Sequence, residues 1–153
     1  AFTPLIRMHS TNQPDENHQW NTNAATTAHL ERMSGVFEGL ADYRSSLMAD
    51  AEVRGLPLIR PLFFHFPEDD VAWSIVDQFL LGADLLVAPV VSPGAEARDV
   101  YLPEGEWQHG PSGVVYVGPD WVRVSAPVGS PAVFGRAETD AARTVVDRLH
   151  SRR

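Results

Sequence analysis

The sequence predicts an α/β barrel remnant joined to an all-β domain. Residues 1–55 are expected to form the last strand, active-site loop and helix of a catalytic (β/α)8, or TIM, barrel. Residues 56–137 are expected to form a sandwich-like C-terminal domain, and residues 138–153 a closing helix and tail. Three observations predict this: an apolar opening run, a long amphipathic helix after a polar loop, and many short strand-like segments beyond it. One strand and one helix cannot form a layer alone, so this pair is expected to need barrel partners.

The composition excludes several classes of function and of site. The chain has 153 residues, of which 44% are hydrophobic, and a formal net charge of −8, with 20 Asp and Glu against 12 Arg and no Lys. This acidic balance argues against nucleic-acid binding. No apolar run approaches the ~20 residues of a membrane span. The absence of Cys excludes disulfides, thiolate metal sites and Cys nucleophiles. The sequence does not identify the cellular compartment, and the cytoplasm is favoured.

The first residues suggest a sugar site. Residues 1–9 are expected to form a buried strand that ends in Arg7 and His9. Residues 10–23 form a polar loop, in which Trp20 is the one apolar side chain. In barrels, the carboxyl ends of strands and the loops after them face the active site. Side-chain amides form hydrogen bonds with pairs of hydroxyls, and an indole stacks on a sugar ring. The candidate substrate-binding residues are therefore Arg7, His9, Asn12, Gln13 and Trp20. A solvated surface loop beside a structural Arg is the alternative.

The next segment is expected to be a helix. Apolar residues recur at three- and four-residue spacing from residue 24 to residue 51. Asn23 or Thr22 is expected to cap its start, and Gly55 to close its end. Gly35 and Gly39 lie inside the pattern and predict a kink or a break into two helices, because Gly weakens a helix interior. The start at Ala1, without Met, indicates either processing or a piece of a longer chain.

The remainder is expected to be mostly β. The predicted strands are residues 58–66, 78–91 with a turn at 82–84, 97–102, 106–108, 113–117, 121–126 and 131–135. Turns are expected at residues 103–105, 110–112 and 118–120, where Gly and Pro gather. Residues 139–148 are expected to form a short helix that closes the chain.

Other polar residues are expected to be structural. Glu68, Asp69 and Asp70 could bind a divalent cation, but a helix-capping surface turn is the preferred interpretation. His65 is expected to be a satisfied core or interface residue, and His109 and His150 to be exposed. The sequence contains no phosphate-binding Gly loop, zinc-type His pattern or Gly-x-Ser-x-Gly elbow. We therefore expect no metal and no cofactor.

Four motifs resemble glycoside hydrolase family 31, the retaining α-glycosidases. Residues 1–10 (AFTPLIRMHS) resemble the last barrel strand of that family, which typically carries Arg-x-His. Residues 56–62 (LPLIRPL) and 78–90 (QFLLGADLLVAPV) resemble the passage from the barrel into the C-terminal β-domain. Residues 99–107 (DVYLPEGEW) are similar to the YLP-x-x-x-W pattern of that domain. The motifs occur in the order of the family, so the resemblance covers nearly the whole chain.

The sulfoquinovosidase branch of the family is the most similar. Residues 9–17 (HSTNQPDEN) and 127–137 (PVGSPAVFGRA), with a short closing helix, resemble that branch, whose members cleave sulfoquinovose from its glycosides. Ordinary α-glucosidases usually lack Asn-x-Pro after the His. The chain departs from the family at residues 108–113 (QHGPSG), where Trp-Thr-Gly is common. This departure is expected to affect the geometry of a hairpin and not the chemistry.

The resemblance implies hydrolysis of α-glycosides with retention, by two carboxylates roughly 5 Å apart. In the family both are Asp on earlier barrel strands, and neither matches a position of this chain, which is therefore expected to be inactive alone. By this resemblance, His9 is expected to bind sugar hydroxyls in the subsite where cleavage occurs, and Arg7 to support that subsite. The expected partners are a carbohydrate and the remainder of the barrel. The alternatives are an α-glucosidase or α-xylosidase parent, or a free-standing carbohydrate-binding β-module.

Overall fold

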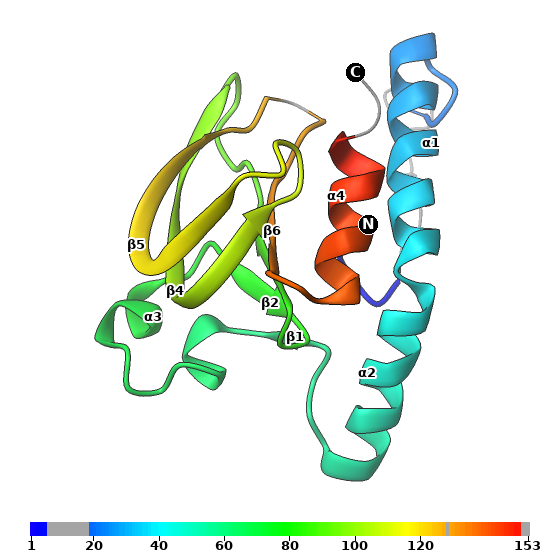
Figure 1. Cartoon of the computed structure of the whole chain (residues 1–153). Helices are drawn as coiled ribbons and strands as arrows, with labels where there is room; N and C mark the ends of the chain where they lie inside the picture. Colours follow the sequence, from blue (N-terminus) through cyan, green and yellow to red (C-terminus); the bar gives the residue numbers. More distant parts are fainter. Residues whose placement is uncertain (6–18, 128, 151–153) are drawn as a thin grey trace, which may run out of the picture.

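The computed structural model describes residues 1–5, 19–127 and 129–150. Helices α1 (Ala24–Gly39), α2 (Ala41–Arg54) and α4 (Asp140–His150) lie on one side of a sheet, and a long hairpin of two strands lies on the other (Figure 1). A 3-10 helix at Leu62–Phe64 and the short helix α3 (Asp70–Ser74) follow the first strand. Within the described residues, no helix has both the length and the apolar character needed to cross a membrane.

The predicted long helix is broken in two, as the glycine pattern indicated. Leu40 lies between α1 and α2 and is 1% exposed. The backbone N–H of Thr26 donates to the Asn23 side chain over 2.9 Å, which confirms Asn23 as the N-cap. Gly55 ends α2 in the left-handed conformation, at φ 70°. Met33, Val36, Leu40 and Leu47 lie in one core across the break, whereas Met48 of α2 is 62% exposed.

Six antiparallel strands form one sheet in the order β1-β2-β3-β6-β4-β5. Their bounds are Ile59–Arg60, Phe79–Leu81, Leu85–Ala88, Ala97–His109, Val115–Ser125 and Ala132–Arg136 for β1 to β6. The predicted turn at residues 82–84 joins β2 and β3, and the predicted closing strand and closing helix are β6 and α4. β6 lies between β3 and β4, so the end of the chain completes the sheet.

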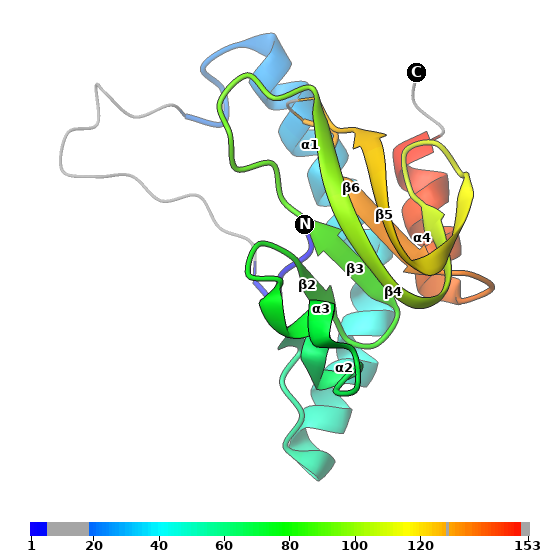
Figure 2. The same ribbon diagram turned by 90° about the vertical axis from the view of Figure 1, so that its left-hand side faces the viewer.

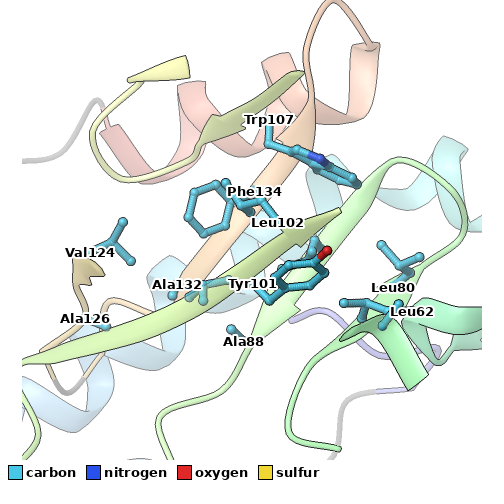
Figure 3. Packing of buried hydrophobic residues seen from close by; sticks show 13 residues of the cluster. Leu62, Leu80, Ala88, Tyr101, Leu102, Trp107, Val124, Ala126, Ala132 and Phe134 are labelled. Carbon is cyan, nitrogen blue, oxygen red and sulfur yellow. The ribbon is translucent and has the colours of Figure 1, made fainter. Parts of the chain in front are cut away.

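The sheet has a core on each face. Leu86 pairs with Phe134 on one face, and Val87 pairs with Val133 on the other, because side chains alternate along a strand. The first core joins the sheet to the β4–β5 hairpin and includes Leu62, Leu80, Leu102, Trp107, Val124 and Phe134 (Figure 3). The second core joins the sheet to the helices and includes Phe2, Val36, Leu40, Leu81, Val133 and Val145.

The expected sandwich is therefore one curled sheet. The β4–β5 hairpin lies across the front of β3 and β6, on the face opposite the helices (Figure 2). The predicted strands at 97–102 and 106–108 are one strand, β4, and residues 103–105 form an irregularity rather than a turn. Likewise 113–117 and 121–126 join in β5, and the turn predicted at 118–120 is wrong. A Cβ on Gly118 would overlap the carbonyl oxygen of Pro103, so glycine here permits close backbone approach.

Two further strand predictions need correction. Of residues 58–66 only Ile59–Arg60 is a strand, and it is followed by Pro61 and the 3-10 helix. Proline has no backbone N–H to give to a sheet, so the ladder stops there. Residues 1–5 are not a strand, although Phe2 is 6% exposed in the helical core. Residues 6–9, the rest of the predicted first strand, lie outside the described residues.

Hydrogen bonds of Tyr43 connect α2 to the β2–β3 turn. Its hydroxyl donates to the carbonyl oxygen of Leu81 over 2.9 Å and accepts from the backbone N–H of Asp84 over 3.1 Å. Burial raises the pKa of Tyr43 to about 12. We expect Tyr43→Phe to lower the free energy of unfolding by about 1–2 kcal/mol, because both backbone groups lose a partner. Urea denaturation measures this change. Tyr116→Phe is the control, because its hydroxyl has no hydrogen bond to any described residue, and an equal loss there would contradict the prediction.

Candidate functional site

One of the five predicted substrate-binding residues lies in the described part of the chain. Trp20 occupies a turn before α1 and is 51% exposed, so its indole is open to solvent. Its carbonyl oxygen accepts a hydrogen bond from the Thr27 hydroxyl over 3.1 Å. This bond connects the turn that contains Trp20 to the beginning of α1. Arg7, His9, Asn12 and Gln13 lie outside the described residues and stay predictions.

An apolar groove lies where the chain begins. Its cavity of about 690 Å³ is lined by Phe2, Met33, Phe79, Val87, Val90 and Pro131, among others. His29 also lines it, and burial, followed by Arg32, lowers the pKa of this His. A largely apolar groove favours packing against another apolar surface over acid–base chemistry.

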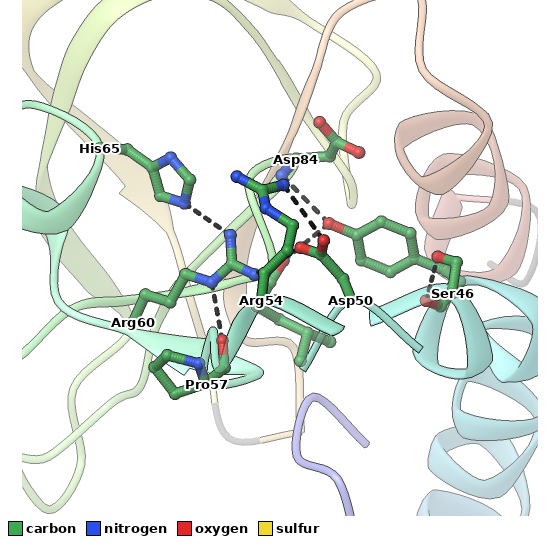
Figure 4. Close-up of polar contacts among 9 residues, drawn as sticks. Ser46, Asp50, Arg54, Pro57, Arg60, His65 and Asp84 are labelled. Carbon is green, nitrogen blue, oxygen red and sulfur yellow. Dashed lines mark hydrogen bonds and ion pairs between the residues drawn. The ribbon is translucent and has the colours of Figure 1, made fainter. Parts of the chain in front are cut away.

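A polar pocket of about 650 Å³ lies between α2, β1 and the β2–β3 turn (Figure 4). Arg60, which is 3% exposed, donates from Nε to the carbonyl oxygen of Pro57 over 2.7 Å. Its Nη1 lies 2.8 Å from Nε2 of His65, and its Nη2 lies 3.7 Å from the Asp50 carboxylate. Burial and then the Arg60 charge lower the pKa of His65, so a neutral ring accepts the Arg60 hydrogen bond. The prediction that His65 is satisfied within the fold is confirmed.

This pocket is built to connect elements rather than to catalyse. Asp50 also pairs with Arg54 over 3.1 Å, so the carboxylate serves two cations of the same cluster. The network joins the end of α2 to β1 and to the residue after the 3-10 helix. The burial of Arg60 was not predicted from the sequence. The available signal was its place between apolar residues in LIRPL.

The acidic triplet caps a helix, as the preferred interpretation held. Oδ1 of Asp69 accepts from the backbone N–H groups of Val71 and Ala72, over 3.0 and 3.2 Å. Its Oδ2 accepts from the Tyr101 hydroxyl over 2.6 Å. No group of three or more His, Asp or Glu side chains could hold a metal ion within the described ranges. Asp69 is therefore a structural residue.

The prediction that His109 is exposed is wrong, because its side chain is 3% exposed. Its ring packs on Phe134 with centroids 4.9 Å apart, and Nδ1 lies 2.8 Å from the Ser112 hydroxyl. Nε2 is buried without a hydrogen-bond partner. Burial lowers the pKa of His109 to about 4. The missed signal is the alternation along β4, in which Trp107 and His109 share the inward face. His150 is exposed, as predicted.

Acid should destabilise the protein through His109. The unfolded His109 binds a proton near its ordinary pKa of 6.5, whereas the folded residue binds one only near pH 4. The free energy of unfolding therefore falls as the pH decreases from about 6.5 to about 4, by about 2–3 kcal/mol from this group. Denaturation curves at pH 7.5 and pH 4.5 measure the loss. His109→Gln should show a smaller loss and His150→Gln an unchanged one. The same loss in all three proteins would contradict the assignment.

Comparison with known proteins identifies the class to which this fold belongs. Residues 55–139 match the Glycosyl hydrolase family 31 C-terminal domain. This range begins at Gly55, the residue that ends α2, and covers every strand of the sheet. The chain therefore belongs to glycoside hydrolase family 31 and carries its C-terminal domain.

Sulfoquinovosidases are among the similar proteins. The chain is 43% identical over 140 residues to a sulfoquinovosidase of Agrobacterium fabrum, covering 91% of this chain and 21% of that protein. A solved sulfoquinovosidase from E. rectale, in complex with the aza-sugar inhibitor IFGSQ, has a TM-score of 0.91 and 35% identity, covering 97% of this chain and 23% of that one. A family 31 α-xylosidase from a soil metagenome, complexed with xylose, has a TM-score of 0.80 and 35% identity, covering 84% and 19%. The chain thus spans about a fifth of the length of these relatives.

Proposed function

We propose that the chain is the C-terminal segment of an enzyme that hydrolyses α-sulfoquinovosides with retention. The similarity to sulfoquinovosidases carries this proposal, because it runs through almost the whole chain. It extends beyond residues 55–139 into the part that precedes the family domain. The α-xylosidase is as identical in sequence as the solved sulfoquinovosidase, but it covers less of the chain at a lower TM-score.

In this proposal the chain has three parts with different roles. Residues 1–55 supply the last strand, active-site loop and helix of the barrel, with the helix broken into α1 and α2. Residues 56–137 are the β-domain, and residues 138–153 close it. The change from helices to strands at Gly55, where the match to the family domain begins, supports this boundary.

The substrate contacts are proposed from the resemblance in the first residues. His9 binds sugar hydroxyls in the subsite where the glycosidic bond is cleaved, and Arg7 supports it. Asn12 and Gln13 bind further hydroxyls through their amides. The exposed indole of Trp20 is suited to stack on the apolar face of a sugar ring, which its 51% exposure supports.

The nucleophile and the acid/base belong to the part of the enzyme that precedes this chain. Retention requires two carboxylates roughly 5 Å apart, one of which attacks the anomeric carbon while the other protonates the leaving oxygen. Asp69 caps a helix and accepts a hydrogen bond from Tyr101, so it is occupied structurally. Asp84 lines the polar pocket beside Arg60 and His65. The 153 residues alone should therefore have no glycosidase activity.

Substrate choice tests the proposal. We expect the full-length enzyme to release p-nitrophenol from the α-sulfoquinovoside with a kcat/KM well above that for the α-glucoside or the α-xyloside. The isolated 153-residue chain, assayed in parallel, should release none. A preference for the glucoside or the xyloside would assign the enzyme to one of those activities instead. Turnover by the isolated chain that is lost on substitution of one of its own carboxylates would refute its role as a non-catalytic segment.

A carbohydrate-binding module is the second candidate, and the exposed Trp20 is the observation that favours it. Such a module would bind sugar without the remainder of an enzyme, through the indole and the loop amides. Titration calorimetry of the isolated chain with α-glycosides distinguishes the two. Binding that disappears in Trp20→Ala would favour the module, whereas no binding by the isolated chain would favour the enzyme segment.

A further inference from the structure

Arg44 of α2 carries a charge that the described residues leave without a counterion. Its side chain is 7% exposed, and its Nη1 has no hydrogen-bond partner. Its guanidinium carbon lies 3.5 Å from the centroid of the Phe37 ring, two helical turns earlier. The ring holds the guanidinium in place and offers the weak attraction of a π-face.

That contact does not replace a counterion. Taking a guanidinium out of water costs several kcal/mol unless a well-placed acceptor compensates. Among the described residues, the arginines that form ion pairs are Arg54, Arg60, Arg98, Arg123 and Arg143. Burial lowers the pKa of Arg44, and no carboxylate of the described residues opposes this effect. A buried arginine in this state indicates an acceptor that lies outside the described residues.

The position of Ala1 shows from where that acceptor comes. Ala1 packs against the core of the helices, in which Leu40 lies one helical turn before Arg44 and accepts its backbone hydrogen bond over 2.9 Å. Phe2 fixes this end of the chain, because its ring is 6% exposed in the core that contains Val36 and Leu40. Ala1 and Phe2 also line the open apolar groove. Polypeptide that continues before Ala1 therefore leaves from the core in which Leu40 is buried, one helical turn from Arg44.

We propose that Arg44 forms a buried ion pair with a carboxylate of the polypeptide that precedes Ala1. This inference rests on the proposed function, in which the chain follows the greater part of a barrel. The pair would anchor α2 to the barrel while the adjacent groove receives apolar side chains. A planar guanidinium stacked on Phe37 presents its N–H groups edge-on, which suits two-point contact with a carboxylate.

Chemical cross-linking in the full-length enzyme tests the pairing. Residues 1–153 contain no Lys, so Arg44→Lys introduces the one lysine amine of this segment. A carbodiimide joins this amine to an adjacent carboxylate as an amide, with loss of one water. We expect peptide mapping by mass spectrometry to find residue 44 linked to an Asp or Glu that precedes Ala1. Arg54→Lys is the matched control on the same helix and should link to Asp50, its partner at 3.1 Å.

Stability gives a second measurement. We expect Arg44→Met to lower the midpoint of thermal unfolding of the full-length enzyme by several degrees, because the carboxylate loses its partner. Arg54→Met should change it by less than about 1 °C, because that arginine belongs to an exposed pair. Together with the cross-link, this difference would establish a buried pair.

Two results would overturn the inference. A link from residue 44 to a carboxylate within residues 1–153, such as Asp15 or Glu16, would assign the counterion to this chain itself. No link, while the Arg54→Lys control reacts, would leave Arg44 with a packing role only, whatever happens to the unfolding midpoint. Neither result affects hydrolysis of glycosides by the wild-type enzyme, whereas failure of the proposed function would abolish that hydrolysis or change its substrate.

Discussion

Gly135→Ala should destabilise the protein by at least about 3 kcal/mol, toward the upper end of the cost of overpacking a core. Gly135 lies in β6 with a neighbouring strand on each side, paired with Leu85 of β3 and Gln108 of β4. A Cβ at this position would overlap both Cβ and Cα of Ala142 in α4. The strand cannot move because both its edges are hydrogen-bonded, so the helix must lift and expose the apolar face that contains Val145.

Urea denaturation and near-ultraviolet circular dichroism would measure this effect. Gly35→Ala is the matched control, because the atom nearest to a methyl group at that position, Nη1 of Arg148, would lie 3.8 Å from it. That change should be neutral, or stabilising by up to ~1 kcal/mol, since alanine is the better helix residue. Adding Ala142→Gly to Gly135→Ala should recover little, because the Cα of residue 142 still blocks the space. Equal stabilities for the two single variants would show that α4 does not pack closely on β6.

His9→Ala should lower kcat/KM of the full-length enzyme for its α-glycoside on the order of 100-fold, as expected for the loss of strong hydrogen bonds to the reacting sugar. The midpoint of thermal unfolding should stay nearly unchanged, since the residue is proposed to contact the substrate and not the core. Initial-rate kinetics and a thermal melt on the same preparations measure both quantities.

His150→Ala provides the control for this second prediction. His150 is exposed at the end of α4, and its Nδ1 lies 3.0 Å from the carbonyl oxygen of Pro111. Its replacement should leave kcat/KM unchanged. Parallel losses of activity and thermal stability in His9→Ala would identify His9 as a structural residue. Unchanged kinetics would remove it from the substrate site.

Local sequence patterns predicted the structure best at positions that only a few residue types can occupy, such as the ends of helices. Asn23 capped α1 and Gly55 ended α2, because a side-chain acceptor and a left-handed residue are needed at those points. Gly35 and Gly39 indicated the break that falls at Leu40. Asp69 capped α3 for the same reason as Asn23. These features depend on the residues of one or two turns, so sequence reveals them.

Predictions that were based on glycine and proline were wrong where these residues serve contacts with distant parts of the chain. The pair Gly118 and Pro119 predicted a turn, yet it lies within β5. The absent side chain permits the approach of Pro103, which is far along the chain. His109 was expected beside a surface turn, but the pairing of β4 with β6 places it on Phe134. The burial of Arg44 was not predicted, and that of Arg60 had one local signal, its place between apolar residues in LIRPL.

The helix caps, most of the helices and strands, the family resemblance and the residues proposed to bind the sugar could be predicted from single segments, because each depends on neighbouring residues or on a motif. The tertiary structure was needed to show that the strands form one curled sheet and that β6 lies between β3 and β4. It also decided which ionisable side chains are buried, among them Arg44 and His109. Strand partners and burial arise from contacts between residues far apart in the chain, and no short segment encodes those contacts.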